Sequence, residues 1–333
     1  MVGSNVPLEQ LLKQLEGLTK ASLKLWDIPP NVRISLLNVA ENVTYLLETP
    51  DGYRSVLRVH RDHYHTREAI DSELAWMDAL SAEGNVSTPR YLKGKNGQAV
   101  QVMRQAGSDL TRFGVLFEFI DGAAPDESDD ITDGYEELGA IAAQCHSHVL
   151  SWEKPEGFER LTWDEDSVFG ENPTWGNWRD APEVTPDIRA ILERVEQAIC
   201  SRLKEYGKSP SRYNLIHADM RLANLLVGDS GTRLIDFDDC GSGWFMYDFA
   251  AAISFIEDDP RIPAFKSAWL RGYRSVRMLS EADEAELDTF IMMRRMALLA
   301  WIGSHIEAPE PQALASGFAA TSARLGQKWL SDL

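Results

Sequence analysis

The chain has 333 residues and is strongly acidic, with 52 Asp and Glu against 33 Lys and Arg and a formal net charge of −19. Such a charge disfavours a groove for nucleic acid, whose phosphates require basic surfaces. Hydrophobic residues make up 44% of the chain, enough for a globular core. No apolar run approaches the ~20 residues of a membrane helix, and the N-terminus lacks the basic and apolar regions of a signal peptide. The sequence therefore predicts a cytoplasmic protein with neither a membrane nor a nucleic acid as partner.

The residue pattern changes near position 120. Before it, short β-type runs alternate with turns, and one helical pattern over residues 66–80 puts Ile70, Leu74, Met77 and Leu80 on one apolar stripe. After an N-terminal helix, strands are expected at residues 33–37, 44–48, 53–59, 99–103 and 115–120.

Beyond residue 120 the pattern is mainly helical. Residues 161–182, rich in Trp, Gly, Pro and Asp, are expected to form a long loop. Helices are expected at residues 134–149, 187–206, 244–257, 263–279 and 281–302. The sequence therefore predicts an α+β fold with an N-terminal lobe over residues 1–119 and a C-terminal lobe over residues 120–333.

The segment over residues 215–239 carries the most informative chemistry. Two strand-like runs flank the residues Gly-Asp-Ser-Gly at 228–231, which favours a tight hairpin. Such a hairpin brings Asn224 and Asp236 together at its ends, and Asp219 lies close enough in sequence to face the same point. These oxygen donors suit Mg²⁺, and phosphoryl transfer uses a metal clamp together with a carboxylate that takes the acceptor's proton.

The spacing His217-x-Asp219-x-x-x-x-Asn224, followed by Asp236, resembles the catalytic loop and metal-binding motif of the aminoglycoside phosphotransferase and choline kinase family, relatives of the protein kinases. The resemblance implies a two-lobed protein-kinase-like fold. It also implies that Asp219 is the catalytic base, that His217 orients the loop, that Asn224 and Asp236 bind Mg²⁺, and that Asp248 braces the loop. The alternative is a buried strand hairpin with exposed acids.

The N-terminal lobe offers a second pair of charged residues. Arg58 lies in the strand expected at residues 53–59, and Glu73 lies inside the apolar stripe, where a buried acid needs a cation. The resemblance puts Arg58 where the family has the Lys that grips the α- and β-phosphates of ATP, with Glu73 as its ion-pair partner. An Arg can bind phosphate there through its fork of donors. The alternative for Glu73 is the margin of the stripe, with its carboxylate in solvent.

Residues 116–122 resemble the family's hinge, whose backbone meets adenine, so the resemblance implies nucleotide contacts from Glu118 and Ile120. The sequence contains no G-x-G-x-x-G, and residues 38–42 occupy the place of that phosphate-binding turn. The resemblance covers about residues 30–260.

The expected function is ATP- and Mg²⁺-dependent phosphorylation of a hydroxyl group on a small molecule, such as an aminoglycoside, an amino alcohol or a hydroxy amino acid. The first alternative is a Ser/Thr protein kinase of the bacterial stress-response type. A catalytically silent nucleotide-binding scaffold is the second, although the presence of Asp219, Asn224 and Asp236 together argues against it.

The distribution of charge predicts an acceptor that is at least partly cationic. An acidic stretch at residues 126–137 contains no basic residue, and Asp238 and Asp239 follow the expected metal ligand. Trp163, Trp175 and Trp178 could offer aromatic faces to an ammonium group, or they could pack among themselves.

Overall fold

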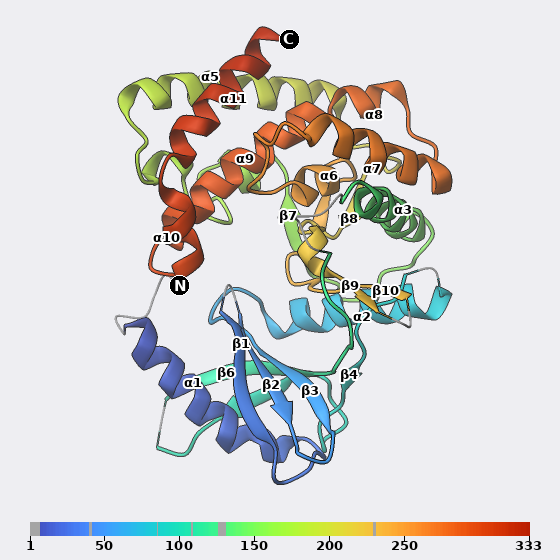
Figure 1. Cartoon of the computed structure of the whole chain (residues 1–333), viewed down its shortest axis with the longest axis vertical. Coiled ribbons are helices and arrows are strands. Elements are labelled where there is room, and N and C mark those ends of the chain that lie inside the picture. The colour runs from blue at the N-terminus through green and yellow to red at the C-terminus, as the bar shows by residue number, and fades with distance from the viewer. Residues whose placement is uncertain (1–6, 40–41, 85, 108, 126–130, 229–230) are drawn as a thin grey trace. The chain divides into compact units, whose positions relative to one another are not determined.

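The computed structural model describes residues 7–39, 42–84, 86–107, 109–125, 131–228 and 231–333. Its contacts divide the chain into two compact units (Figure 1). The first unit comprises residues 1–79, 88–121 and 155–159, and the second comprises residues 80–87, 122–154 and 160–333. The first unit is built around a sheet and the second is mainly helical, which confirms the predicted α+β class.

An antiparallel sheet forms the centre of the first unit. Its strands run in the order β1-β2-β3-β6-β4, and β5 also pairs with β6. They are β1 (Arg33–Val39), β2 (Val43–Glu48), β3 (Arg54–Val59), β4 (Tyr91–Leu92), β5 (Gln101–Arg104) and β6 (Thr111–Glu118). In β2 buried and half-buried residues alternate, as expected for a strand with one face on a core.

Helix α1 (Leu8–Ser22), followed by the short η1 (Leu23–Leu25), packs on this sheet. Leu11, Leu15 and Leu18 recur at helical spacing and share one hydrophobic core with Tyr45 and Leu57 of the sheet. The predicted N-terminal helix thus completes the core of the first unit.

Helix α2 (Arg67–Glu83) carries the predicted apolar stripe, whose members are all buried. It begins at Thr66, whose hydroxyl accepts a hydrogen bond from the N–H of Ala69 at 3.0 Å. Glu73 lies within the stripe and is fully buried. The last turn of α2, from residue 80, belongs to the second unit.

The second unit is a group of helices around α9, which is buried along nearly its whole length (Figure 1). The long helices are α3 (Thr132–His148), α5 (Pro186–Tyr206), α7 (Ile262–Val276), α9 (Leu287–Ser304) and α11 (Phe318–Ser331). Shorter ones are α4 (Glu165–Phe169), α6 (Tyr247–Ala252), α8 (Glu281–Ala285), α10 (Pro309–Ala315), η2 (Trp178–Asp180) and η3 (Leu222–Asn224).

Two small sheets complete the second unit. Strand β11 (Gly241–Trp244) pairs with β7 (Leu161–Trp163) in parallel and with β8 (Tyr213–Ile216) in antiparallel orientation. Strands β9 (Leu225–Gly228) and β10 (Gly231–Leu234) form the predicted hairpin, although its tip at residues 229–230 lies outside the described residues.

Helices α3 and α7 approach each other closely because each contributes a glycine to the contact. A Cβ atom on Gly272 would lie 1.8 Å from the carbonyl oxygen of Glu136, and one on Gly139 would lie 2.1 Å from that of Trp269. Neither distance is possible for a real side chain, so this helix contact requires glycine at both positions.

Three predicted elements differ from the structure. The helix expected at residues 244–257 is shorter, because Trp244 ends β11 and α6 covers Tyr247–Ala252. The helix expected at residues 281–302 divides into α8 and α9 at Glu286, which is the C-cap of the first helix and the N-cap of the second. The expected loop at residues 161–182 contains β7, α4 and η2.

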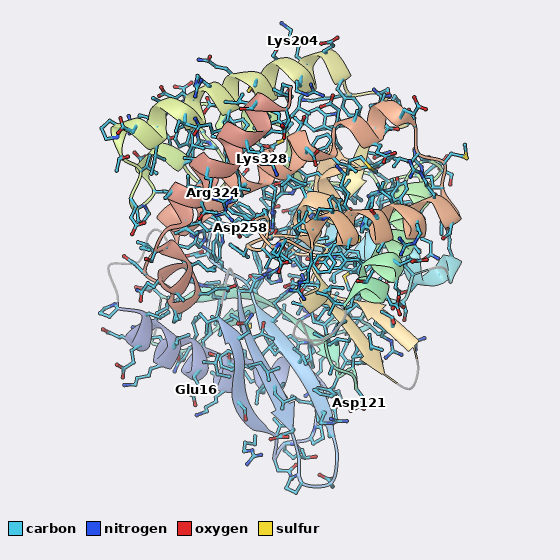
Figure 2. The ribbon with its side chains drawn as sticks, turned by 45° about the horizontal axis from the view of Figure 1, so that its top comes forward. Glu16, Asp121, Lys204, Asp258, Arg324 and Lys328 are labelled. Carbon is cyan, nitrogen blue, oxygen red and sulfur yellow. The ribbon has the colours of Figure 1, made fainter. Side chains whose placement is uncertain are left out.

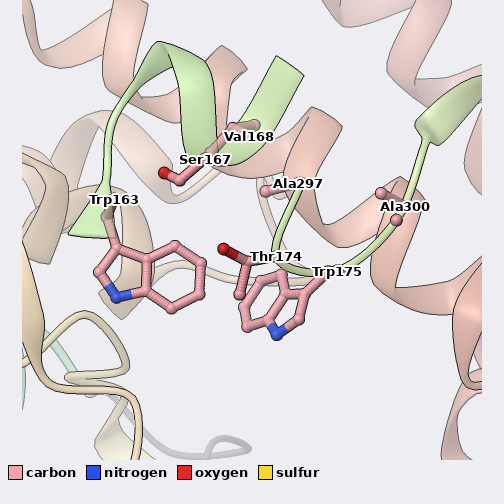
Figure 3. Close-up of a pocket in the computed structure, with 8 residues that line it drawn as sticks. Trp163, Ser167, Val168, Thr174, Trp175, Ala297 and Ala300 are labelled. Atoms are coloured by element: carbon pink, nitrogen blue, oxygen red, sulfur yellow. The ribbon is translucent and has the colours of Figure 1, made fainter. Parts of the chain in front are cut away.

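The three tryptophans of this segment, Trp163, Trp175 and Trp178, are buried, and two of them pack against each other. The rings of Trp163 and Trp175 lie 4.7 Å apart. They line a recess beside Ala297 and Ala300 of α9 that has no room for a water molecule (Figure 3).

The acidic surface is partly compensated by basic residues from other segments. In the stretch at 126–137, Glu136 pairs with Arg271 of α7 at 2.7 Å, so the absence of basic neighbours in sequence does not hold in space. Residues 126–130 lie outside the described residues. Asp258 likewise pairs with Arg324 of α11 at 3.3 Å on the exposed surface (Figure 2). Within the described part of the chain, no helix is long and apolar enough to cross a membrane.

Candidate active site

The hairpin brings the ends of the predicted motif together within the second unit. Leu225 and Leu234 are partners in the ladder, and beyond them the N–H of Ile235 donates to the carbonyl of Asn224 at 2.9 Å. Asn224 and Asp236 therefore emerge at adjoining ends of β9 and β10, as predicted. Arg160 donates to the carbonyl of Cys240 at 2.8 Å and holds the segment after Asp236 from outside.

The carboxylate of Asp219 is engaged on both oxygens. Its Oδ1 accepts from Nη2 of Arg294 at 2.9 Å, and Nε of Arg221 lies 3.4 Å from the same oxygen. Its Oδ2 accepts from Nδ2 of Asn224 at 2.9 Å. Asp219 thus sits between two guanidinium groups and one amide.

These neighbours keep Asp219 ionised. Burial alone raises the pKa of Asp219, but Arg221, Arg294 and the hydrogen bond from Asn224 lower it by more, so the net pKa lies below its ordinary value. In return, the carboxylate of Asp219 raises the pKa of Arg221. At neutral pH the Asp219 carboxylate is available as a proton acceptor.

The amide of Asn224 is oriented by the same loop. Its Nδ2 donates to both the carbonyl oxygen of Asp219, at 2.8 Å, and the Asp219 carboxylate. Because both donors point inward, Oδ1 of Asn224 is the atom that can face a cation. Asp236 supplies an exposed carboxylate at the other hairpin end.

Together these oxygen donors fit Mg²⁺, which takes one or two protein ligands and completes its shell with phosphates and water. Among the described residues, no group of three or more His, Cys, Asp or Glu side chains could hold a metal by itself. A Mg²⁺ ion at Asn224 and Asp236 would take its remaining ligands from water or a bound phosphate.

His217 connects the loop to the hairpin. Its Nε2 lies 3.1 Å from the carbonyl oxygen of Ile235, and its Nδ1 accepts from the N–H of Asp219 at 3.3 Å. The two partners fit the neutral tautomer with its proton on Nε2. These contacts match the orienting role that the resemblance implied.

Asp248, at the start of α6, braces the loop as the resemblance implied. It is fully buried, and its two oxygens accept from the backbone N–H groups of His217, at 3.2 Å, and Ala218, at 2.7 Å.

A second histidine stands behind this brace. Nε2 of His146 lies 2.9 Å from Asp248, and Nδ1 lies 3.0 Å from the hydroxyl of Tyr273, which itself accepts from Arg277 at 2.7 Å. Because the Asp248 carboxylate can only accept, Nε2 of His146 donates to it, and Nδ1 of the neutral ring accepts from the Tyr273 hydroxyl. A buried chain of hydrogen bonds therefore runs from α7 through α3 to the catalytic loop.

In the first unit, the predicted pair of Arg58 and Glu73 is confirmed as an ion pair. Nη2 of Arg58 donates to both carboxylate oxygens of Glu73, at 2.8 and 2.7 Å. The Arg58 side chain is 8% exposed and that of Glu73 is 0% exposed. The guanidinium also lies over the ring of Phe117, 5.2 Å from its centre. The alternative of a solvated Glu73 is wrong.

The predicted hinge segment, residues 116–122, includes the last three residues of β6 and the four residues that follow the strand. The backbone N–H of Glu118 donates to the carbonyl of Arg90 at 2.8 Å, so a nucleotide would have to use the carbonyl side of this residue. Ile120 follows the strand and is half-buried, and Arg54 pairs with Asp121 at 2.6 Å just beyond it. The nucleotide contacts of Glu118 and Ile120 stay predictions. Residues 40 and 41 of the phosphate-binding turn lie outside the described residues.

The sequence interpretation missed Arg221, Arg294 and His146. A usable signal existed for Arg294, because it and Arg295 interrupt an otherwise apolar helix. Burying two charges there requires two specific partners.

Comparison with known proteins now adds a family. Residues 34–279 match the model of the phosphotransferase enzyme family. A solved microcompartment-associated aminopropanol kinase is 43% identical, covers 95% of this chain and 97% of its own, and superposes with a TM-score of 0.88. An amicoumacin kinase shares the fold at 22% identity and a TM-score of 0.74, with 94% of this chain and 93% of its own covered. The homoserine kinase of Gluconobacter oxydans is 25% identical over 75% of this chain and 74% of its own length.

The family match covers most of the chain and contains the catalytic loop, the hairpin and the Arg58–Glu73 pair. The predicted protein-kinase-like fold is confirmed by the solved relatives. The chain therefore belongs to the phosphotransferase enzyme family and is an enzyme of the kinase type.

Proposed function

We propose that this protein transfers the γ-phosphoryl group of ATP, with Mg²⁺, to the hydroxyl group of a small amino alcohol. The observation that carries the acceptor class is the 43% identity to an aminopropanol kinase along 95% of the chain. The homoserine kinase is far less similar, at 25% identity. A hydroxy amino acid is therefore the second candidate.

The site residues divide this work. Asp219 orients the acceptor hydroxyl and takes its proton as the oxygen–phosphorus bond forms. Asn224 and Asp236 hold Mg²⁺, which neutralises phosphate charge during transfer. In the first unit, Arg58, fixed by Glu73, binds the non-transferred phosphates. The backbone near Glu118 and Ile120 contacts adenine.

Charge separates the two acceptor classes. An amino alcohol carries an ammonium group alone, whereas a hydroxy amino acid adds a carboxylate. The net charge of −19 disfavours anions in general. Near Asp219, however, Arg221 and Arg294 are local cations that could attract a carboxylate.

The test uses acceptor pairs that differ by one carboxylate. Isopropanolamine is compared with threonine, propanolamine with homoserine and ethanolamine with serine, each with ATP and Mg²⁺, and ADP release is measured. Propan-2-ol, which is isopropanolamine without its ammonium group, isolates the contribution of positive charge. We expect kcat/KM to be highest for an amino alcohol and to fall when either the carboxylate is added or the ammonium is removed.

A higher kcat/KM for the amino acid of each pair would replace the proposal with the hydroxy amino acid alternative. Faster phosphorylation of a generic protein substrate than of any small acceptor would instead support the Ser/Thr kinase alternative. ATP binding with no acceptor turned over would support the silent scaffold.

A further inference from the structure

The residue before the proposed base has an unusual backbone. Ala218 has φ +64°, in the left-handed region that residues with a side chain rarely adopt. Ala218 lies two residues after the end of β8 and directly before Asp219, so its backbone conformation sets the direction in which the Asp219 side chain leaves the chain. A strained conformation persists when surrounding contacts fix it.

Both polar groups of Ala218 are held by buried side chains. Its N–H donates to Oδ1 of Asp248 at 2.7 Å, and its carbonyl accepts from Nη1 of Arg294 at 3.1 Å. Asp248 comes from α6 and Arg294 from the middle of α9, and both are almost completely buried. Side chains from two different helices therefore hold the N–H and the carbonyl of the strained Ala218.

Arg294 also holds the carboxylate that follows. Its Nη2 donates to Asp219 Oδ1 at 2.9 Å, while its Nε donates to the hydroxyl of Ser254 at 3.0 Å. The guanidinium lies over the ring of Trp175, 4.9 Å from its centre. The planar guanidinium of Arg294 is held by hydrogen bonds from its three nitrogens and by the ring of Trp175 on one face. It therefore fixes the backbone of Ala218 and the carboxylate of Asp219 relative to each other.

We propose that Arg294 is a positioning residue for catalysis, which together with Asp248 clamps the strained Ala218 and directs the Asp219 carboxylate toward the acceptor hydroxyl. This inference rests on the proposed function of Asp219 and adds a residue outside the sequence motif. Arg294 acts through Asp219, without contact to the nucleotide.

The next residue on the same helix provides a matched control. Arg295 is as buried as Arg294, at 2% exposure each, and also pairs with a buried carboxylate, that of Glu257. Its other partners are Ser322 and Phe318, both on α11. Loss of Arg295 therefore removes a comparable buried ion pair without touching the catalytic loop.

The experiment compares Arg294→Met and Arg295→Met, each alone and with Ala218→Gly. We expect Arg294→Met to lower kcat by about 10²-fold, since a misplaced base has that order of effect. Its affinity for Mg·ATP should be unchanged. Arg294→Met and Arg295→Met should lower the melting temperature to a similar extent. Arg295→Met should leave kcat unchanged.

Glycine adopts a positive φ without strain, so it lessens the need for a clamp. Ala218→Gly should therefore restore part of the kcat that Arg294→Met loses. Equal losses of kcat in Arg294→Met and Arg295→Met would overturn the proposal, because the effect would then be one of general stability. A double variant no faster than Arg294→Met would overturn the clamp on Ala218.

A readout independent of turnover separates this inference from the proposed function. Amide hydrogen exchange of the segment 215–224 should accelerate in Arg294→Met and stay unchanged in Arg295→Met. If wild-type protein phosphorylates none of the acceptors, the proposed function fails, while the exchange result still tests the clamp. If Arg294→Met does not fold, Arg294→Lys keeps the charge, loses the fork and takes its place in each comparison.

Discussion

Each unit contains a pair of an arginine and a carboxylate. The proposed chemical group is the arginine in the first pair and the carboxylate in the second. In the first unit, Arg58 has the proposed chemical role and Glu73 holds it. In the second unit, Asp219 has the proposed chemical role and Arg294 the proposed holding role. In both pairs the holding residue is the more deeply buried, with side-chain exposures of 0% for Glu73 against 8% for Arg58, and 2% for Arg294 against 15% for Asp219.

The comparison shows how a charged group is kept ready for chemistry in a mostly apolar region. Burying an isolated charge costs free energy, so a partly buried functional charge requires a partner of opposite charge. Breaking a buried ion pair by removal of one partner typically costs about 3 to 5 kcal/mol. Asp219 would keep Arg221 and Asn224 as partners, so its loss of Arg294 should cost less. Each functional group should therefore depend on a residue that never touches substrate.

The largest effect is expected where the chemical group itself changes. Asp219→Asn should lower turnover by about 10²- to 10⁴-fold, because the amide cannot accept the proton. Binding of Mg·ATP should remain nearly intact. Single-turnover kinetics and nucleotide titration measure the two effects separately, and unchanged turnover would remove Asp219 from the role of base.

Asp236→Asn is the contrasting variant at the same site. It should lose metal-dependent nucleotide binding, because it alters a proposed Mg²⁺ ligand rather than the base. Equal Mg·ATP affinities for Asp219→Asn, Asp236→Asn and the parent would contradict the assignment of the hairpin ends to the metal.

The effects of substituting Arg58 and Glu73 in the first unit should be coupled. Glu73→Gln and Arg58→Met should each raise the KM for ATP about tenfold or more, equivalent to at least about 1.4 kcal/mol. The double variant should cost less than the sum, because each single change already breaks the same contact. A thermodynamic cycle on the KM for ATP measures this coupling. Additive effects would mean that the ion pair does not prepare Arg58 for phosphate.

A substitution at the contact of α3 and α7 tests how much this close packing contributes to the stability of the second unit. Gly272→Ala puts a methyl group where 1.8 Å separates it from the Glu136 carbonyl, so α7 must move away from α3. Forced separation of packed elements costs about 3 kcal/mol. The melting temperature should fall by several degrees. Gly317→Ala, whose added Cβ meets nothing within 4 Å, is the control for loss of glycine as such, although its φ of +75° adds strain. A smaller loss for Gly272→Ala than for Gly317→Ala would refute the close contact.

The sequence predicted one of the two pairs and missed the other, for a physical reason. Glu73 stands out because it interrupts an amphipathic stripe, and Arg58 lies on a neighbouring strand. Arg294 and Arg295 interrupt the apolar sequence of α9 and so signal buried charges, but the helix is buried on nearly all sides and its periodicity does not show which way either side chain points. The partner of Arg294, Asp219, is distant in sequence, and no local pattern connects the two.

The same reasoning explains the remaining differences. The hairpin was predictable because turn residues and strand propensity act locally, and the motif spacing then placed Asn224 and Asp236. The chain from Arg277 through Tyr273 and His146 to Asp248 depends on how α3, α6 and α7 pack. Tertiary packing also buries the tryptophans of residues 161–182, for which the sequence left two roles open.

The smallest expected effect is a difference in how the stability of the two regions, the Arg58–Glu73 pair and the support of the catalytic loop, depends on pH. The pair of Arg58 and Glu73 contains no group that ordinarily titrates near neutrality, whereas the support of the catalytic loop contains His146. Burial lowers the pKa of His146; Asp248 opposes this shift, Arg277 adds to it, and the net pKa lies below the ordinary value of 6.5. Tyr273 and the stacked ring of Phe245 complete its surroundings.

Because the folded-state pKa of His146 is lowered, the unfolded chain binds this proton first as pH falls. The stability contribution of neutral His146 is complete above pH 6.5 and is lost below it, by at most about 1.4 kcal/mol per pH unit. His146→Gln can donate to Asp248 and accept from Tyr273 but cannot titrate. Between about pH 7.5 and 5, the urea midpoint of the parent should fall more steeply than that of His146→Gln, and the other histidines cancel in this difference. Parallel curves would show that His146 does not link the loop's support to pH.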